Sequence, residues 1–316
     1  MTNRTFHNEQ RGLTLIELLV ALVISSVIAL AAFSAIVVSR QGFATVDAAS
    51  QLRDNARFAT DIIQRLALQT GYQDVAYSAT IRPASSTAPA NVSGFTNGTP
   101  SVSGILVTST TKALGSTGYG SDVLILRYQA PETYPGSGRV DKGIIDCMGR
   151  SKADDDDIPI DRDDRLLSVL YVADSRGQPA LMCRTESGSG QPLVEGVENF
   201  QVLYGIDGDN DSVTDRYMRA DQLIVAGNDA ATKANWNMVR SIKIGLILRS
   251  SVGATQETAS QTLYPFGNAR ASASAAVGSA FANSVNDPGT VASAPADRRL
   301  RLQTSFTIHL RNEQNL

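Results

Sequence analysis

The chain has 316 residues, a formal net charge of −3, and only two histidines and two cysteines. This length is sufficient to bury a hydrophobic core, and the mildly acidic balance gives no electrostatic reason to expect nucleic-acid binding. The sequence contains no nucleophile elbow, phosphate-binding loop, dinucleotide fingerprint or zinc-protease motif, so we do not expect an enzyme.

The first predicted element is a long apolar helix. Between Leu13 and Val38 the only charged residue is Glu17. A helix of about 20 apolar residues spans a bilayer, so this stretch is long enough to do so. A cleavable secretory signal fits poorly, because its apolar core is usually about 7–15 residues and its small-residue cleavage site follows that core. Here Gly12 precedes the apolar run, at the end of a short polar leader.

The hexapeptide 12–17, GLTLIE, resembles the prepilin-peptidase site of type IV pilins and type II secretion pseudopilins. The resemblance implies cleavage between Gly12 and Leu13, methylation of the new N-terminal Leu13, and retention of Glu17. A carboxylate inside a membrane costs roughly 2.5–3.5 kcal/mol on insertion scales and normally has a partner. Glu17 would neutralise the α-amino group of a neighbouring subunit and so set the register of assembly. The alternative is an ordinary single-pass anchor with Glu17 near the membrane interface.

The leader arginines, Arg4 and Arg11, stay on the cytoplasmic side by the positive-inside rule. We therefore expect a single pass through the inner membrane with the C-terminal bulk in the periplasm, followed by incorporation into a filament at the cell surface. Because that compartment is oxidising, we expect the only two cysteines, Cys147 and Cys183, to form a disulfide.

Helical periodicity continues beyond the apolar stretch. Gly71 is a natural C-terminal stop, so we expect one helix from Leu13 to about Thr70. The alternative is two helices broken at Gly42. Charged residues at 57, 61 and 65 are spaced for two i,i+4 ion pairs. Apolar residues recur every three or four positions and predict an amphipathic stripe: Val46, Ala49, Leu52, Ala56, Ala59, Ile63 and Leu66.

The remainder of the chain predicts a β-rich head. Residues 72–104 are rich in Ser, Thr, Ala, Pro and Gly and predict a loop, and residues 266–296 predict a long low-complexity insertion. In the last two predicted strands every second residue is apolar, which is typical of an antiparallel sheet with one buried face. We expect the outer half of the long helix to cover that face. Strand signals occur at 104–111, 122–128, 166–172, 180–184, 196–204, 238–249 and 300–311, with a hairpin turn at 174–177.

The head segments 200–207 and 236–250, with the closing strand, resemble the PilW family of minor pilins. The resemblance implies an α+β, type IV pilin-like fold in which a long N-terminal helix packs on an antiparallel β-sheet head. The expected organisation is a leader over 1–12, a transmembrane helix half over 13–40, an amphipathic half over 41–70 and a head over 71–316.

The function implied by the resemblance is that of a minor pilin that sits at low copy at the filament tip and helps to initiate pilus assembly. Expected partners are the major pilin, other minor pilins, prepilin peptidase and the inner-membrane assembly platform, with no nucleic acid. The alternatives are a secretion pseudopilin resembling GspJ, and a membrane-tethered adhesion or ligand-binding module.

Four aspartates after the strand predicted at 196–204 occupy positions 1, 3, 5 and 9 of a calcium-binding loop: Asp207, Asp209, Asp211 and Asp215. Ser212 stands where such loops carry an invariant glycine, and Met218 where they carry a bidentate glutamate, although Asp221 follows a little further on. The alternative is a hydrophilic turn without a metal.

A second acidic run comprises Asp154–Asp157 with Asp161, Asp163 and Asp164. Charges this dense are typical of a solvated loop, with a cation site as the alternative. The two cysteines bracket this run, so a disulfide would restrain it and contribute about 3–4 kcal/mol in the chain-entropy model.

Overall fold

The computed structural model describes residues 14–73, 88–131, 133–134, 137, 141–151, 165–186, 188–270, 273, 291–312 and 314. The chain forms two compact units, residues 1–47 and residues 48–316. The predicted cleavage and methylation site at Gly12 and Leu13 lies outside the described residues, as do the acidic run at 154–164 and most of the insertion predicted at 266–296.

Helix α1 (Leu15–Gln69) is one continuous element, which confirms the single helix predicted from the sequence and excludes a break at Gly42. It ends because Gly71 adopts a φ of +75°, a conformation that glycine reaches without a Cβ penalty. The Gly71 N–H donates to the carbonyl oxygen of Arg127, which ties the helix end to a strand of the head.

The buried stripe of α1 starts later than the sequence predicts. The prediction for Val46 is wrong, since its side chain is 69% exposed, and Ala49 is only half-buried. Ala48 is the first buried residue of the helix, so packing on the head begins there. The predicted ion pairs at 57–61 and 61–65 are not formed among the described residues. The buried helix residues are Ala48, Leu52, Ala56, Ala59, Ile63, Leu66 and Ala67.

Within the described residues, the head contains two antiparallel sheets and two two-stranded ribbons. The five-stranded sheet has the order β1 (Val92–Phe95), β4 (Val123–Tyr128), β5 (Leu166–Ser175), β6 (Gln178–Arg184) and β7 (Gln191–Glu195). The four-stranded sheet has the order β13 (Arg301–His309), β10 (Val239–Arg249), β8 (Val197–Ile206) and β9 (Arg216–Met218). Two ribbons pair β2 (Gly98–Ser103) with β3 (Leu106–Thr111), and β11 (Gln261–Leu263) with β12 (Ala292–Ala294). Short helices α3 (Ala220–Leu223) and α4 (Asp229–Asn237) lie between β9 and β10.

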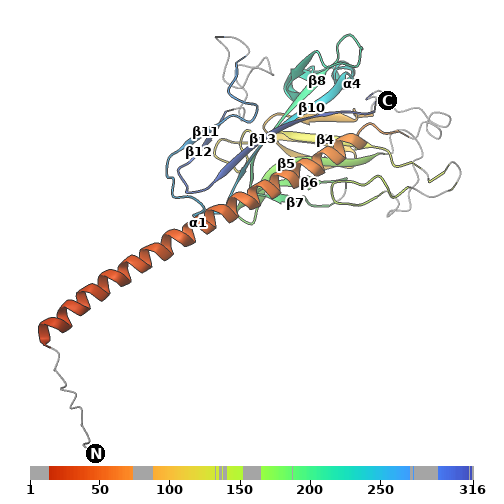
Figure 1. Cartoon of the computed structure of the whole chain (residues 1–316). Helices are drawn as coiled ribbons and strands as arrows, with labels where there is room; N and C mark the ends of the chain where they lie inside the picture. Colours follow the sequence, from red (N-terminus) through yellow and green to blue (C-terminus); the bar gives the residue numbers. More distant parts are fainter. Residues whose placement is uncertain are drawn as a thin grey trace, which may run out of the picture. The chain divides into compact units, whose positions relative to one another are not determined.

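One hydrophobic core joins α1 to both sheets. Ile63 of the helix belongs to the same buried cluster as Leu170 of β5 and Ile244 of β10. Figure 1 shows the C-terminal part of α1 lying along the strands of the head. The opposite face of the five-stranded sheet, which includes Val123 and Val169, forms a second cluster against the β2–β3 ribbon. The prediction that the outer half of the helix covers the buried sheet face is therefore confirmed.

All the strands predicted from alternating or β-branched runs are present, with small shifts at their ends. The predicted hairpin is also confirmed: Arg176 and Gly177 form its two-residue loop with φ values of +56° and +79°, as a type I′ turn requires. The loop predicted at 72–104 is wrong in its second half, which contains β1 and β2. These strands read VSGF and GTPSVS, so they lack the apolar runs on which strand prediction depends.

Candidate functional site

The first candidate site is the N-terminal half of α1. Among the described residues, α1 is the one helix long and apolar enough to cross a membrane. Its large apolar side chains between Leu15 and Val38 are all at least half exposed. A continuous apolar surface of this extent is favourable only in apolar surroundings, such as a bilayer or a bundle of packed helices.

Glu17 lies in the first turn of this helix and forms a capping box with Thr14. The backbone N–H and the hydroxyl of Thr14 both donate to Glu17 Oε2, at 3.0 and 2.9 Å. In return, the Glu17 N–H donates to the Thr14 hydroxyl oxygen at 3.3 Å. Such reciprocal bonds satisfy backbone groups that a helix start otherwise leaves unpaired. The carboxylate therefore keeps Oε1 free of hydrogen bonds within the described part of the chain.

Thr14 is a residue that the sequence analysis missed. The Thr-x-x-Glu spacing immediately before an apolar run is itself the signal of a capping box, and it was present in the sequence. The consequence is a defined helix start one residue after Thr14, which orients the Glu17 carboxylate back toward the chain end.

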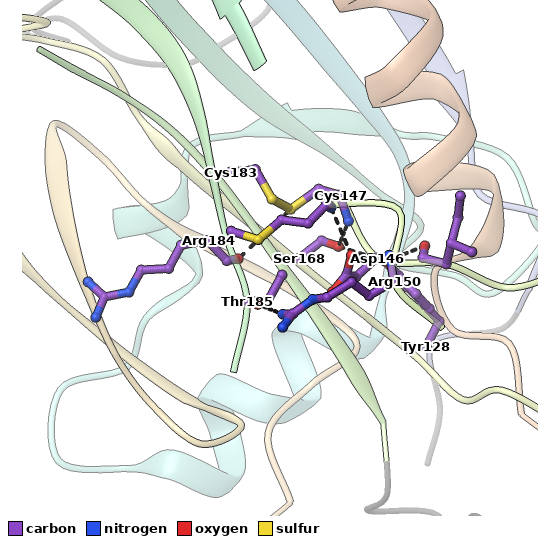
Figure 2. The surroundings of a disulfide bond; sticks show 10 residues. Tyr128, Asp146, Cys147, Arg150, Ser168, Cys183, Arg184 and Thr185 are labelled. Atoms are coloured by element: carbon purple, nitrogen blue, oxygen red, sulfur yellow. Dashed lines mark hydrogen bonds and ion pairs between the residues drawn. A yellow bond between two sulfur atoms is a disulfide. The ribbon is translucent and has the colours of Figure 1, made fainter. Parts of the chain in front are cut away.

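The predicted disulfide between Cys147 and Cys183 is confirmed, with a Cα–Cα distance of 5.9 Å. It joins the segment 141–151 to β6 (Figure 2). A second attachment lies beside it, where the Cys147 N–H donates to Ser168 Oγ at 3.0 Å. The Ser168 hydroxyl in turn lies 2.6 Å from the hydroxyl oxygen of Tyr128, and burial of that phenol raises its pKa. Segment 141–151 is thus held covalently and by hydrogen bonds against the sheet.

The four aspartates predicted to bind calcium are only partly brought together. Carboxylate oxygens of Asp207, Asp209 and Asp215 lie within 4.8 Å of one another. Asp211 is outside this group, and its Oδ1 accepts a hydrogen bond from the Val213 N–H at 2.8 Å. The repulsion of Asp211 and Asp215 raises the pKa of Asp209, so the loop carries concentrated negative charge.

Asp207 already has partners inside the protein. Its two oxygens accept hydrogen bonds from the N–H groups of Asp211 and Ser212, and Arg240 Nε lies 3.4 Å from its Oδ2. Ser212 adopts a φ of +69°, the left-handed conformation that glycine supplies in a calcium loop. Asp221 is not available to complete the site, because Arg219 pairs with it at 2.6 Å. The backbone geometry fits a calcium loop better than the donor set does, since Arg240 competes with a cation for Asp207.

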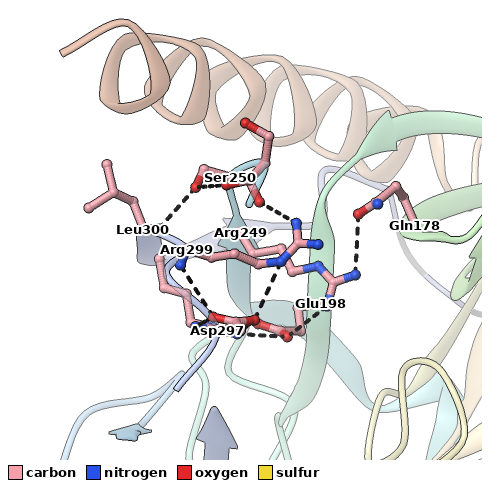
Figure 3. Close-up of polar contacts among 9 residues, drawn as sticks. Gln178, Glu198, Arg249, Ser250, Asp297, Arg299 and Leu300 are labelled. Atoms are coloured by element: carbon pink, nitrogen blue, oxygen red, sulfur yellow. Dashed lines mark hydrogen bonds and ion pairs between the residues drawn. The ribbon is translucent and has the colours of Figure 1, made fainter. Parts of the chain in front are cut away.

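A charged network missed by the sequence analysis crosses the four-stranded sheet. Glu198 of β8 accepts hydrogen bonds from Arg249 at 3.3 Å and from Arg301 at 2.8 Å. Asp297 accepts from Arg301 at 2.9 Å and lies 3.4 Å from Arg299 Nε (Figure 3). These partners are up to 103 residues apart in sequence, so no local pattern could have paired them.

Two family models match parts of this chain. Residues 169–312 match the family model described as Type IV Pilus-assembly protein W, and residues 7–33 match the prokaryotic N-terminal methylation motif. Among solved structures, a type IV-like pilin from Thermus thermophilus matches with 12% identity and a TM-score of 0.40, over 84% of this chain and 98% of that chain. No curated protein matches the sequence significantly.

The methylation motif, the exposed apolar helix and the antiparallel head define a type IV pilin-like protein, with an N-terminal helix consistent with an inner-membrane anchor. Within that class, residues 169–312 of the chain match the PilW family of type IV pilus-assembly proteins. The two family matches imply interactions with pilins and with prepilin peptidase. Proteins of this class are generally structural rather than enzymatic.

Proposed function

We propose that this protein is a minor pilin that is stored in the inner membrane and incorporated at low copy at the filament tip, where it helps to initiate pilus assembly. The observation that carries the proposal is the combination, in one chain, of a methylation motif, an exposed apolar helix and a large head of the PilW family.

Processing is the first step of the proposed mechanism. Prepilin peptidase would cut between Gly12 and Leu13, and the new α-amino group would be methylated at Leu13. Thr14 then becomes the second residue of the mature chain, so the helix start that it caps lies directly beside the new terminus. The protein would remain a single-pass membrane protein with its head, residues 71–316, in the periplasm until extraction.

Glu17 then acts during assembly. Thr14 holds Glu17 Oε2, which leaves Oε1 to accept a hydrogen bond from the α-amino group of a neighbouring subunit. In apolar surroundings, an ammonium–carboxylate contact is much stronger than in water, and a misplaced neighbour leaves both charges unpaired. Glu17 would therefore set the axial register between packed helices, with Thr14 positioning it.

The size of the head favours a position at the filament tip over repeated copies of this subunit along the shaft. Beyond Gln69 the head contains two sheets, two ribbons and their connecting loops. The head is therefore far larger than the helix, which must pack at close spacing in a filament. Identical heads stacked along a shaft would crowd one another. A subunit at the tip meets no neighbour above it, and it can contact other minor pilins and the assembly platform from below.

Gene deletion tests this proposal. We expect loss of surface filaments while the major pilin remains in the inner membrane. Quantitative mass spectrometry of sheared filaments should find this protein far below the abundance of the major pilin. Near-equal stoichiometry would refute the tip position.

Matched variants test the role of the helix start. Glu17→Ala should abolish complementation of the deletion while the protein still inserts in the membrane. Thr14→Ala should impair assembly less severely, and Thr14→Ser, which retains the capping hydroxyl, should restore it. Equal filament numbers for Thr14→Ala and Thr14→Ser would remove the capping box from the mechanism.

A further inference from the structure

A cavity of about 620 Å³ lies on the face of the four-stranded sheet that points away from the main core. Its floor includes Asn199 of β8 and Ile247 of β10, which are register partners. The adjacent residues Phe200 and Leu246 point into the main core, so the side chains of Asn199 and Ile247 face the opposite way. The walls come from the loop 114–119, the β5–β6 turn and the β11–β12 ribbon.

Asn199 is the unusual group in this cavity. Only 4% of the residue is exposed, yet its Oδ1 is buried without a hydrogen-bond partner. Buried polar side-chain atoms almost always have a partner, so an unsatisfied amide at the floor of a cavity indicates a missing hydrogen-bonding group. The side-chain amide offers one acceptor and two donors to whatever occupies the cavity.

The charges along the cavity wall are already matched. Arg249 donates to Glu198 at 3.3 Å and to Gln178 Oε1 at 3.2 Å (Figure 3). Asp174 accepts the Gly177 N–H at 3.0 Å and stands at the exposed hairpin turn. Since the lining contains two carboxylates and one paired guanidinium, it provides no free cation for an anionic ligand.

The remaining polar lining is neutral and includes Ser116, whose hydroxyl donates to the Ala113 carbonyl oxygen. The hydroxyl groups of Thr117, Tyr119 and Ser293 line the cavity and make no hydrogen bond within the described residues. Hydroxyls both donate and accept, and they lie here beside apolar wall residues such as Pro179 and Leu263. Polar groups that converge between apolar walls, in a volume of this order, are typical of a small-molecule site.

We propose that this cavity binds a neutral saccharide. Sugar hydroxyls can donate to the buried Asn199 Oδ1, which lacks a partner, and can exchange hydrogen bonds with the solvent-accessible hydroxyls of the wall. The C–H faces of a sugar ring can lie against Pro179, Ile247 and Leu263. This site is independent of the assembly role of the helix, because none of its residues belongs to α1. Such a saccharide could come from the amino sugars of a cell wall or from hexose glycans on a cell surface, because both share this chemistry.

The test uses the full-length protein in lauryldimethylamine oxide micelles, because detergents with sugar headgroups would compete for the site. Chitotriose represents the amino-sugar source and maltotriose the hexose source. We expect calorimetry to show binding of one of them with a Kd at or below about 1 mM. Binding of chitotriose alone indicates a cell-wall ligand, and binding of maltotriose alone a hexose glycan. Failure of both to bind overturns the proposal.

Variants separate ligand binding from folding. Asn199→Ala should weaken saccharide binding about tenfold, since one hydrogen-bonding group is lost. Because the amide is unsatisfied without ligand, the same change should leave the melting temperature of the free protein unchanged or raised. Asn235→Ala is the matched control: its Nδ2 donates to the Leu223 carbonyl outside the cavity, so stability should fall and affinity should not.

A second variant tests the site without changing a buried residue. Thr117 is exposed on the 114–119 loop, so Thr117→Val should weaken binding without disturbing the core. Wild-type affinity in both Asn199→Ala and Thr117→Val would overturn the assignment of the site.

Discussion

Replacing both cysteines of the Cys147–Cys183 disulfide by serine should lower the free energy of unfolding of the head substantially. The bond closes a loop of 36 residues, and the chain-entropy relation for that length gives about 4 kcal/mol. A typical domain has only about 5–15 kcal/mol of net stability, so the variant should unfold at a much lower denaturant concentration. The loss should arise mainly because the unfolded chain gains freedom.

The single tryptophan provides the assay. Trp236 is buried and makes an edge-to-face contact with Tyr204, with ring centroids 4.7 Å apart, so its fluorescence reports unfolding of the head. Guanidinium titration of the full-length protein in detergent, with and without reductant, measures the difference. Reductant should destabilise the wild type to the level of the double variant and should not affect the variant itself.

Hydrogen exchange locates the change. The amide of Cys147, which donates to Ser168, and the amides of Met148 and Arg150, which donate to Asp146, should lose protection. A destabilisation below about 1 kcal/mol, with these amides still protected, would refute the reasoning, because it would mean that hydrogen bonds alone hold segment 141–151.

Three further predictions follow from the N-terminal motif, the aspartate loop and a buried lysine. Intact-mass analysis should find a mature chain that starts at Leu13 with one added methyl group; retention of Met1 in a host with active prepilin peptidase would contradict it. Calcium should bind the 207–215 loop only weakly, because Arg240 already pairs with Asp207, and a chelator that shifts the melting temperature strongly would contradict this. Burial lowers the pKa of Lys112 to about 8, so the unfolded state binds more protons above that pH. Stability relative to Lys112→Met should therefore rise between about pH 8 and the usual lysine pKa of about 10.4. A difference in the free energy of unfolding that does not change with pH would contradict the lowered pKa of Lys112.

Prediction from sequence succeeded where the signal was local. The apolar run around Glu17, the i,i+3/i+4 pattern up to Leu66 and the alternation in β10 each lie within one element. The two-residue turn at Arg176 and Gly177 is equally local, because its backbone conformation depends on those two residues. Prediction failed at β1 and β2, because these strands form through pairing with other strands and not through an apolar run of their own. β1 pairs with the apolar β4, and β2 pairs with β3 over the second hydrophobic cluster.

The sequence by itself determined a membrane-length helix with one acid next to a methylation motif, and an antiparallel head with two cysteines. These features follow from periodicity and short motifs, which act over a few residues. Tertiary structure decided which distant groups meet. It brought Asp207 to Arg240 while separating Asp211 from the other aspartates, and it placed the unsatisfied Asn199 at the floor of a cavity. These arrangements depend on strand order and register across long loops, which are set by burial of the whole core rather than by any local pattern.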